Sequence, residues 1–576
     1  METFPLNFAD YAAFGLFFVA VSVIGYWAGR HERASSDAYF LAGHQLPWYV
    51  VGGSFIASNI SSEHFIGMIG AAYVYGICVA LSEWANVFTF SLIIWFFIPF
   101  LLASRVFTMP EFLEKRFNRT LRQFFALVTV ISNIVAFLAA VLYGGAIALQ
   151  ELFGWSMWVS IFTLGLVAGV WAIYGGLASV AWTDFFIVIV MLAGGLVVTL
   201  LALNSASGGS WDLWEGLQNT LAANRAVDGA WKEAVQSKAE ILAGTDSYNR
   251  LSVYQPITHR LWPWPAMIFA IVSISIWYNV LNQFMIQRVL GAKDIWHARM
   301  GIVLAGFLKV MLPVIIVLPG LIMFARDPSV LLLPWDQVQP EADKGYVRLL
   351  HALVPSGLRG LFLAALFGAI QSTVNSVLNS TATIVTLDFY KGWFKPDAAD
   401  SQLVRVGIIT TTAVLFISMV LAGFINDLGE GLFTYIQSLY AFFAPPFAAI
   451  FLLGILSKRI NAAGATWAVF LGFALGIGVK IFLQTADNPP AWLVPFLNQA
   501  AFNWLFCVVL CVVVSLLTSP PEAEKVSDQM TLNWRKLNIF DHLGDSWGSS
   551  VVVWWLIFVV LVFALAGIFS GWVFPL

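Results

Sequence analysis

The sequence predicts an all-α polytopic membrane protein, and three observations support this fold class. Hydrophobic residues make up 60% of the 576 positions and charged residues only 11%, whereas soluble domains carry about 25% charged residues. The mean hydropathy is +0.83, and apolar runs of roughly 18 residues or more, long enough to cross a bilayer as a helix, recur along the chain. These runs are unbroken, unlike the short alternating strands of a membrane β-barrel.

About fourteen membrane spans are predicted from these runs. They cover residues 8–29, 46–72, 77–104, 124–152, 156–174, 180–204, 262–287, 298–325, 358–385, 404–424, 431–456, 462–484, 497–518 and 549–573. The segments 205–261 and 326–357 mix tryptophan, proline and charge, and we expect short helices there over an extracellular mouth. Segment 519–548 is polar and is interpreted as an inner linker. The three cysteines lie in apolar runs without metal-ligand spacing and are interpreted as buried apolar side chains.

Orientation follows from the distribution of lysine and arginine. The segments after odd-numbered spans hold 18 of the 29 basic residues. Because basic residues concentrate on the cytoplasmic side of a membrane, both termini are expected to be extracytoplasmic. The chain shows no long glycosylated tail, which favours a bacterial inner membrane as the location of this multi-pass protein.

A polar cluster interrupts the second predicted span at ASNISSEHFIGM, residues 57–68. The small residues at 52–54 precede it and weaken the helix, so we expect a local break. Carbonyl groups released inside a membrane need a ligand or a wet cavity, and neutral oxygens suit a weakly held alkali cation. A bent helix packed through small residues is the alternative, but Glu63 and His64 favour a functional site.

Two ionisable residues, Glu83 and Lys309, fall well inside predicted spans. Such a residue costs at least a few kcal/mol at the centre of a membrane. Glu83 is flanked by apolar residues and would be protonated or paired there. Lys309 would snorkel to the interface, pair with Glu83, or donate to a bound polyol. A purely structural ion pair is the alternative interpretation.

Neutral polar side chains gather on three further spans. The ninth span carries a stripe at spacings of three and four, which indicates either a cation site or interhelical hydrogen bonds: Gln371, Ser372, Asn375, Ser376, Asn379 and Ser380. Spans 7 and 11 combine rings and amides, as a sugar site requires, in Tyr278, Asn279, Asn282, Gln283 and Gln437. Asp184 is a further candidate, with a solvated charge at a helix end as the alternative.

These features indicate a transporter and not an enzyme, because no catalytic constellation emerges from the sequence. Interrupted spans in corresponding halves are typical of transporters built from inverted repeats. Span 2 opens one group of five spans and span 7 opens the next. The predicted organisation is an extra N-terminal span and inner loop at 1–45, a first repeat at 46–204, an extracellular loop at 205–261, a second repeat at 262–456 and additional spans at 457–576.

The similarity to a known family rests on eight segments: DAYFLAGHQLPW (37–48), ASNISSEHFIGM (57–68), SEW (82–84), YGGLASVAWTD (174–184), QRVLGAKD (287–294), FLKVMLP (307–313), LNSTATIVTLDFYK (378–391) and YIQSLYAFFAPPFAAIFLLGI (435–455). They resemble the solute:sodium symporter family, in particular its sodium/glucose cotransporter branch with bacterial sodium/galactose and animal sodium/glucose members. The resemblance covers about residues 10 to 460. It implies a five-plus-five inverted-repeat core of leucine-transporter type with discontinuous helices.

The resemblance also implies roles for individual residues. The sodium ligands would be the backbone carbonyls of Ala57, Ile60 and Ala369 and the hydroxyls of Ser372 and Thr373. The positions matching sugar ligands are Asn59, His64, Glu83, Ser275, Lys309 and Gln437. Tyr278 matches a ring that stacks under the sugar as inner gate, Met68 and Phe433 match an outer hydrophobic gate, and Asp184 matches an aspartate on the sodium exit route.

Two positions depart from the family pattern. Asn279 stands where some members have a second aromatic ring, so stacking on the sugar is expected to differ. Asn375 stands where members with an additional sodium site have threonine. The second departure implies one sodium ion per sugar.

The leading hypothesis is sodium-coupled symport of a glucose- or galactose-like hexose into the cell by alternating access. Symport of another polyol such as myo-inositol is the first alternative, and a membrane sugar sensor that does not transport is the second. A carboxylate solute is disfavoured because Glu83 would repel an anion. The expected partners are the sugar, co-transported sodium and the lipid bilayer, with no nucleic acid.

Overall fold

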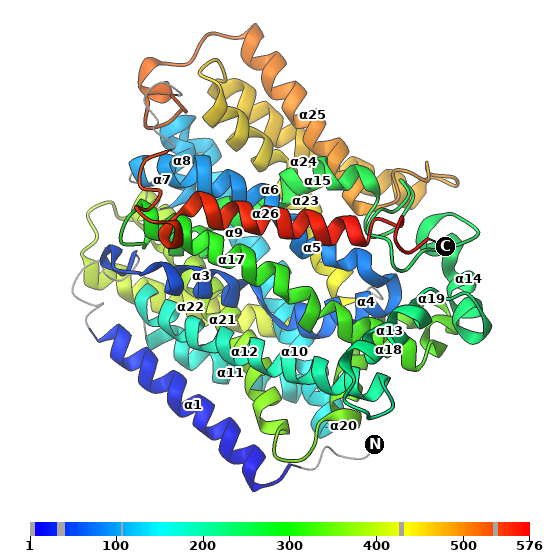
Figure 1. Ribbon diagram of the computed structural model, residues 1–576. Coiled ribbons are helices and arrows are strands. Elements are labelled where there is room, and N and C mark those ends of the chain that lie inside the picture. Colours follow the sequence, from blue (N-terminus) through cyan, green and yellow to red (C-terminus); the bar gives the residue numbers. More distant parts are fainter. Residues whose placement is uncertain are drawn as a thin grey trace.

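The computed structural model describes residues 6–30, 41–104, 108–174, 176–425, 431–533 and 540–575. Within these ranges the regular structure is helical, apart from one isolated bridge between Leu46 and Ala292. The helices form a single bundle, in which most of the long helices run roughly alongside one another (Figure 1). The predicted all-α class is therefore confirmed.

The first half of the chain ends with its longest described helix, which has 30 residues. Its helices are α1 (Phe8–Gly29), α3 (Trp48–Asn59), α4 (Ile69–Tyr75), α5 (Leu81–Trp84), α6 (Asn86–Leu92), α7 (Ile98–Ser104), α8 (Met109–Arg116), α9 (Arg119–Ser132), α10 (Ala139–Phe153), α11 (Met157–Tyr174) and α12 (Leu177–Ala206). Wider π-helical turns join several of them, at Glu63–Met68, Ile93–Phe97 and Asn133–Leu138.

The second half of the chain begins with two helices of the 205–261 segment. Its helices are α13 (Leu213–Asn224), α14 (Gly229–Ala243), α15 (Phe269–Ile276), α16 (Gln283–Leu290), α17 (Ile295–Ile315), α18 (Val317–Arg326), α19 (Trp335–Asp343), α20 (Gly345–Leu353), α21 (Arg359–Ile384), α22 (Asp400–Ala422), α23 (Leu432–Leu456), α24 (Ala462–Thr485), α25 (Phe496–Leu517) and α26 (Val551–Ile568). Two π-helical turns follow α15 and α21, at Trp277–Leu281 and Val385–Phe394.

Twelve helical stretches of the described residues are long and apolar enough to cross a membrane. They correspond to predicted spans, with two differences. The stretch Glu63–Leu102 runs through the end of predicted span 2 and most of span 3, and the apolar part of α11, Met157–Gly169, is shorter than the others. The chain is thus a multi-pass membrane protein, while the count of fourteen stays a prediction.

Two helices are broken at corresponding places. Helix α3 ends at Asn59, and Ile60 adopts an extended conformation (φ −80°, ψ 122°) before the π-helical turn at 63–68. In the second half, Asn282 adopts nearly the same conformation (φ −72°, ψ 119°) between the turn at 277–281 and α16. These breaks open the two segments predicted as repeats, 46–204 and 262–456, as expected for discontinuous helices in an inverted-repeat transporter.

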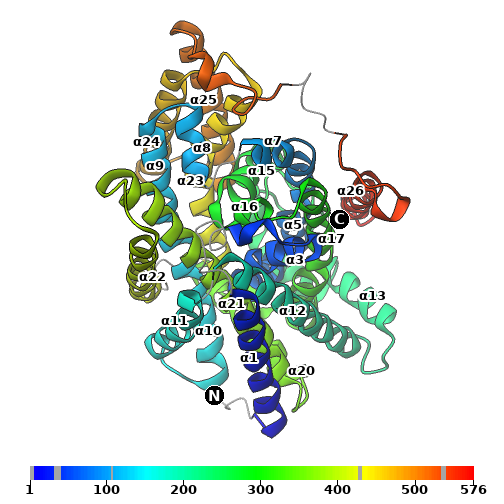
Figure 2. The ribbon, with the colours of Figure 1, turned by 90° about the vertical axis from the view of Figure 1, so that its left-hand side faces the viewer.

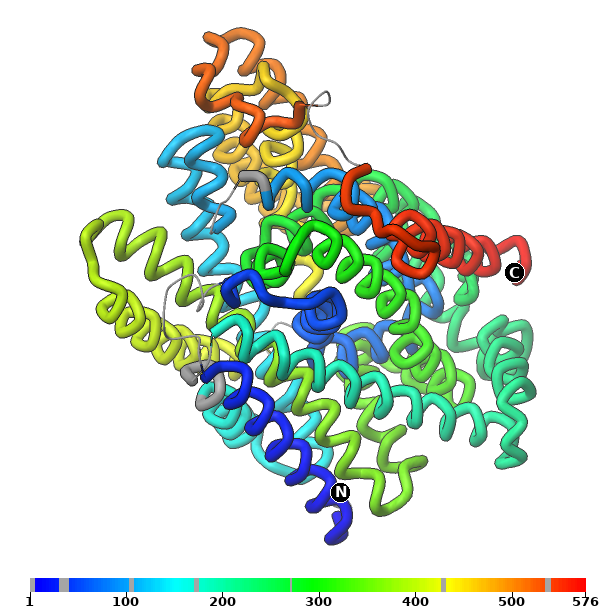
Figure 3. Tube along the Cα trace, turned by 60° about the vertical axis from the view of Figure 1, so that its left-hand side comes forward, coloured from blue at the N-terminus to red at the C-terminus, as the bar shows by residue number. Residues whose placement is uncertain are grey.

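Helix α3 lies at the centre of the bundle, where it packs against α12, α16, α17 and α21. Helix α1 lies at one edge, beside α12 and α21 (Figure 2). Helices α24 and α25 lie at the opposite edge, where they pack against each other and against α23 (Figure 3). The break in α3 is therefore buried deep inside the protein, away from both edges.

Three arginines assigned to predicted inner loops are instead buried: Arg116, Arg288 and Arg299. Arg116 donates to the carbonyls of Gly454, Ser457 and Ile460 at the end of α23, and Arg299 donates to the carbonyl of Ile94. A guanidinium group has five donors and tolerates burial when carbonyls accept from them. These three side chains therefore belong to the interior of the protein, and the orientation inferred from the basic residues stays a prediction.

The 326–357 segment forms helices, as predicted, and one of them, α19, contacts α4 and the start of α23. Helix α19 packs against α4, where Gly70 leaves no room for a side chain: a Cβ atom there would lie 2.5 Å from the Asp343 carboxylate. The Leu432 N–H at the start of α23 donates to Asp343 Oδ2 at 2.9 Å. Asp343 therefore caps α23, and its burial raises its pKa to about 7.

Replacing Asp343 with asparagine should stabilise the protein at alkaline pH. A raised pKa in the folded state means that the carboxyl group contributes stability below its ordinary pKa of 3.8, and that this contribution is lost as the pH rises through about 7. Asparagine keeps the acceptor for Leu432 and removes the charge. We expect the variant to melt above the native protein at pH 8, with the difference shrinking towards pH 5. Thermal unfolding in detergent measures this.

The matched control is Asp336→Asn, an exposed aspartate on the same helix. It should leave the pH dependence of unfolding unchanged. A difference between Asp343→Asn and the native protein that is the same at pH 5 and pH 8 would show that the Asp343 carboxyl group does not titrate between these values.

Candidate functional site

A buried polar cavity lies at the break after α3. It is lined from seven helices and from the π-helical turns at 63–68 and 277–281. All nine residues that the resemblance assigned to the sugar and its gates line it: Asn59, His64, Met68, Glu83, Ser275, Tyr278, Lys309, Phe433 and Gln437. The π-helical turn at 63–68 presents the adjacent residues Glu63 and His64 to the same cavity, as such widened turns do at functional sites. The structure therefore brings together residues that are up to 378 positions apart in the sequence.

Glu83 and Lys309 form an ion pair on one wall of this cavity. Lys309 Nζ lies 2.5 Å from Glu83 Oε2, and both side chains are about 3% exposed. Lys309 also donates to the Asn59 side-chain oxygen at the end of α3. The pairing alternative for Lys309 is thus correct, and the snorkelling alternative is wrong, because the ammonium group points into the protein.

His64 contacts the other oxygen of the Glu83 carboxylate. The Ser61 N–H donates to His64 Nδ1 at 3.3 Å, so Nδ1 is an acceptor and Nε2 carries a ring proton. His64 Nε2 lies 3.4 Å from Glu83 Oε1. Both oxygens of Glu83 are therefore held, one by an ammonium group and one by the imidazole ring. This fixes the carboxylate at the cavity wall, where a hydroxyl group of a bound solute would meet a rigid acceptor.

Glu63 and Gln437 form a second polar pair, and the sequence did not assign Glu63 a role. Gln437 Nε2 donates to Glu63 Oε1 at 3.0 Å, which joins α23 to the π-helical turn after the break. The Gln437 carbonyl oxygen is left as an acceptor beside the cavity. Two carboxyl groups, those of Glu63 and Glu83, therefore face the cavity beside the single ammonium group of Lys309. This arrangement suits a solute that donates hydroxyl groups better than an anion.

An amide network completes the wall, and sequence reasoning missed its central residue, Asn86. Asn86 Oδ1 accepts from Ser275 Oγ and Asn279 Nδ2, both at 2.9 Å. Asn86 belongs to α6, whereas Ser275 belongs to α15 and Asn279 to the π-helical turn at 277–281. The only sequence signal was its position three residues after Glu83. The Asn279 carbonyl oxygen has no hydrogen-bond partner among the described residues, so it remains available to a solute.

The predicted gate residues close the cavity on two sides. Met68 and Phe433 line it and are almost fully buried. Gly67 lets them approach, since a Cβ atom there would lie 2.8 Å from the Phe433 nitrogen. On another side Tyr278 packs its ring against Phe137 and Tyr440, with centroids 5.8 and 5.5 Å away.

The predicted sodium ligands meet beside the break. Thr373 Oγ1 on α21 lies 3.3 Å from the Ile60 carbonyl and 3.4 Å from the Ser58 carbonyl. Because α3 ends at Asn59, the carbonyls of its last turn, including that of Ala57, have no N–H partner further along the helix. Ala369 lies on the Thr373 side of α21, one turn earlier, and is fully buried. Neutral oxygens from two helices therefore converge.

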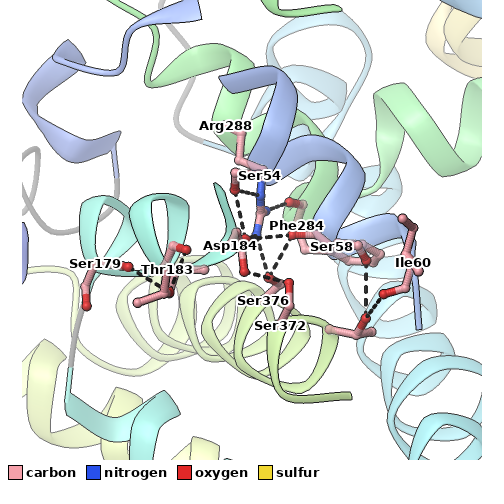
Figure 4. Close-up of polar contacts among 12 residues, drawn as sticks. Ser54, Ser58, Ile60, Ser179, Thr183, Asp184, Phe284, Arg288, Ser372 and Ser376 are labelled. Atoms are coloured by element: carbon pink, nitrogen blue, oxygen red, sulfur yellow. Dashed lines mark hydrogen bonds and ion pairs between the residues drawn. The ribbon is translucent and has the colours of Figure 1, made fainter. Parts of the chain in front are cut away.

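Asp184 lies next to this group, in the interior and not in water as one interpretation allowed. Its carboxylate accepts from Ser54, Ser58 and Ser372 at 2.8, 2.9 and 2.5 Å (Figure 4). Arg288 of α16 completes the cluster with an ion pair at 3.1 Å. Asp184 thus touches a predicted sodium ligand, Ser372, and its charge is balanced by a guanidinium group that the sequence assigned to a loop.

A helical bundle with two broken helices around a buried polar cavity defines a secondary transporter. The chain belongs to the sodium:solute symporter family, whose model matches residues 39–472. It is therefore a sodium-coupled symporter and not an enzyme, which confirms the predicted class.

Relatives with curated names extend along most of the chain. The sodium/glucose cotransporter of Vibrio parahaemolyticus is 34% identical over 551 residues, which cover 93% of this chain and 96% of that protein. A human sodium/myo-inositol cotransporter is 34% identical over 556 residues, 93% of this chain and 76% of that one. Both similarities fit the predicted sodium/glucose cotransporter branch.

The fold is confirmed by a solved structure. A Na+-coupled sialic acid symporter in a substrate-bound, outward-open state aligns with a TM-score of 0.69 at 21% identity, over 89% of this chain and 98% of that one. The two proteins therefore share the inverted-repeat bundle of leucine-transporter type.

Proposed function

We propose that the protein carries a glucose- or galactose-like hexose into the cell with sodium, by alternating access. The observation that carries this proposal is the Lys309–Glu83–His64 cluster, held next to Asn59 at the end of a broken helix. Ammonium, carboxylate and amide groups held at the cavity wall offer donors and acceptors to several hydroxyl groups at once. Tyr278 supplies a ring face for the C–H groups of a sugar.

Sodium binds, in this proposal, where Ile60 and Thr373 meet, with Ala57, Ala369 and Ser372 as the other ligands. The site holds neutral oxygens, which suits a monovalent cation that must leave again. Asp184 accepts the hydrogen bond of the Ser372 hydroxyl and so orients its oxygen towards the ion. Residues that contact metal ligands commonly orient them in this way. The Arg288 guanidinium already neutralises Asp184, which supports one sodium ion per sugar. The protein would lie in the bacterial inner membrane with both termini outside.

A polyol such as myo-inositol is the second candidate solute, supported by the human relative at equal identity. The experiment is a competition screen in proteoliposomes that carry out sodium-driven uptake of labelled glucose. Glucose and galactose should compete at the lowest concentrations, and proline and sialic acid should not compete. Strongest competition by myo-inositol would select the second candidate, and competition by sialic acid or proline would contradict both.

Ser372→Ala and Thr373→Ala should each raise the sodium concentration needed for half-maximal uptake, by roughly five- to tenfold. Each removes one neutral oxygen from a site of about five ligands, a loss on the order of 1 kcal/mol. Folding should persist, because alanine favours the helix. Ser380→Ala is the matched control, since Ser380 lies on the same stripe and is equally buried. Unchanged sodium dependence in both test variants would show that the stripe only packs helices.

A further inference from the structure

Trp262 is a further residue of the sugar cavity, the cavity at the break after α3, and the sequence assigned it no role. It lines this cavity and is 7% exposed. Its indole nitrogen, Nε1, has no hydrogen-bond partner among the described residues. A buried indole N–H usually has an acceptor, and leaving it without one costs free energy. The cavity therefore contains a donor that is available to a solute.

A buried histidine holds the backbone of Trp262 in place. The Trp262 N–H donates to His259 Nδ1 at 2.7 Å, and the Leu261 N–H donates to the same atom at 3.2 Å. Burial lowers the pKa of His259 to about 3, so the ring is neutral at physiological pH. Its single proton is then on Nε2, which donates to the Tyr248 hydroxyl oxygen at 2.9 Å.

The same network joins this segment to α4. The Tyr248 hydroxyl donates to the carbonyl of Tyr75, the last residue of α4, at 2.7 Å. Arg250 is fully buried and donates to two further carbonyls of that helix, each at 2.8 Å. Helix α4 directly follows the π-helical turn at 63–68, which forms part of the cavity wall. Trp262 is therefore fixed relative to the wall that it faces.

Helix α25 contributes a second residue on this side of the cavity. Leu497 also lines the cavity, and the side chain of the next residue, Asn498, donates to the Ile257 carbonyl at 2.8 Å. The start of α25 is thus bound to the segment that carries Trp262. Because the 205–261 segment is predicted to be extracellular, Trp262 and Leu497 are expected to cover the cavity from the outer side.

Several other donors of the cavity already have acceptors within the protein. Lys309 donates to Glu83 and to Asn59, and the Gln437 side chain donates to Glu63. A sugar hydroxyl group both donates and accepts, so a solute needs donors as well as the acceptors described above. The indole N–H of Trp262 is a donor that no described residue uses.

We propose that Trp262 is a further solute-binding residue, whose indole N–H donates to a hydroxyl group on the outward side of the bound sugar while its ring covers that side. The proposal rests on the proposed function of the cavity as a sugar site, and it adds a requirement for one particular hydroxyl group of the solute. His259 is a positioning residue, because it contacts the backbone of Trp262 and does not line the cavity.

Trp262→Phe tests the proposal, because phenylalanine keeps an aromatic ring and removes the donor. The measurement is competition by glucose, and by each of its monodeoxy derivatives, against sodium-driven uptake of labelled glucose. We expect the affinity for glucose to fall by roughly fivefold or more, the effect of one lost hydrogen bond. The monodeoxy derivative that lacks the contacted hydroxyl group should bind the native protein and the variant equally well, within about twofold.

Trp84→Phe is the matched control. Trp84 is 4% exposed and its indole N–H also has no partner among the described residues, but it does not line the cavity. This variant should leave every affinity unchanged. An unchanged glucose affinity in Trp262→Phe would overturn the proposal. An equal fall for glucose and for every monodeoxy derivative would also overturn it, because the ring would then only pack.

A second measurement tests the position of Trp262 without the phenylalanine variant. Trp262→Cys should react with a membrane-impermeant thiol reagent from the same face as Trp214→Cys, a position on α13 that is 66% exposed, and saturating glucose should slow this reaction by roughly fivefold or more. The native cysteines are buried, which keeps the background low.

Two results of this labelling would overturn the proposal: reaction from the opposite face only, or a rate that does not change with glucose although the native protein accumulates glucose. If the native protein takes up neither glucose nor its derivatives, the proposed function fails. The face from which Trp262→Cys reacts then still decides whether this residue covers the cavity from the outer side.

Discussion

Glu83→Gln is expected to lower sodium-driven sugar uptake at least tenfold, and Lys309→Gln to do the same. Each variant leaves the other side chain without its buried ion-pair partner, because the two groups lie 2.5 Å apart and are about 3% exposed. A tenfold loss of affinity corresponds to about 1.4 kcal/mol. The double variant should lose much less than the sum of the two, since neither charge is then left alone.

The measurement is a double-mutant cycle on sugar affinity at saturating sodium. Lys480→Gln is a suitable control, because Lys480 is an exposed lysine of α24 outside the sugar cavity. It should leave the affinity unchanged. Additivity of Glu83→Gln and Lys309→Gln within about 0.5 kcal/mol would mean that the two charges do not interact, and Lys309 would then have no place in the sugar site.

Arg288→Met should abolish most sodium-dependent uptake and lower the stability of the protein. The guanidinium group contacts Asp184, Ser54 and Ser376, which belong to three different helices. Its removal leaves Asp184 as a buried charge without a cation, a loss of roughly 3–5 kcal/mol. We expect a clearly lower melting temperature and at least a tenfold fall in uptake.

Two further variants separate charge from packing at this position. Asp184→Asn added to Arg288→Met removes the unpaired charge and should recover most of the lost melting temperature, without restoring uptake. Arg288→Lys keeps the charge but not the planar fork of donors, so it should be intermediate in stability. If Arg288→Met has the same melting temperature as the native protein, the ion pair does not hold these helices together.

The break in span 2 could be predicted because its cause is local. Glycines before a run of polar residues weaken a helix wherever it lies, and the interruption at Ile60 follows. The matching break at Asn282 was less visible, because the residues around it include aromatic and β-branched side chains that also occur in continuous spans. Its position became evident only from the backbone conformation.

The charged part of the site was predictable for a different reason. A carboxylate and an ammonium group inside predicted spans each need a partner, so Glu83 and Lys309 implied one another before any contact was known. Arg288 gave no such signal, because it follows a span and counts as a loop residue. Asn86 gave only a weak signal, its position three residues after Glu83, since one amide among apolar residues is common. Their partners come from other helices, which no local pattern shows.

Sodium-driven accumulation tests the central claim most directly. The purified protein is reconstituted into liposomes, and uptake of labelled glucose or galactose is followed with an inward sodium gradient and with an equal potassium gradient. A membrane potential of about 100 mV, negative inside, adds roughly 2.3 kcal/mol per sodium ion to the chemical gradient. The account predicts transient accumulation above the external concentration with sodium only, increased by the potential. Equal uptake with sodium and potassium would contradict it.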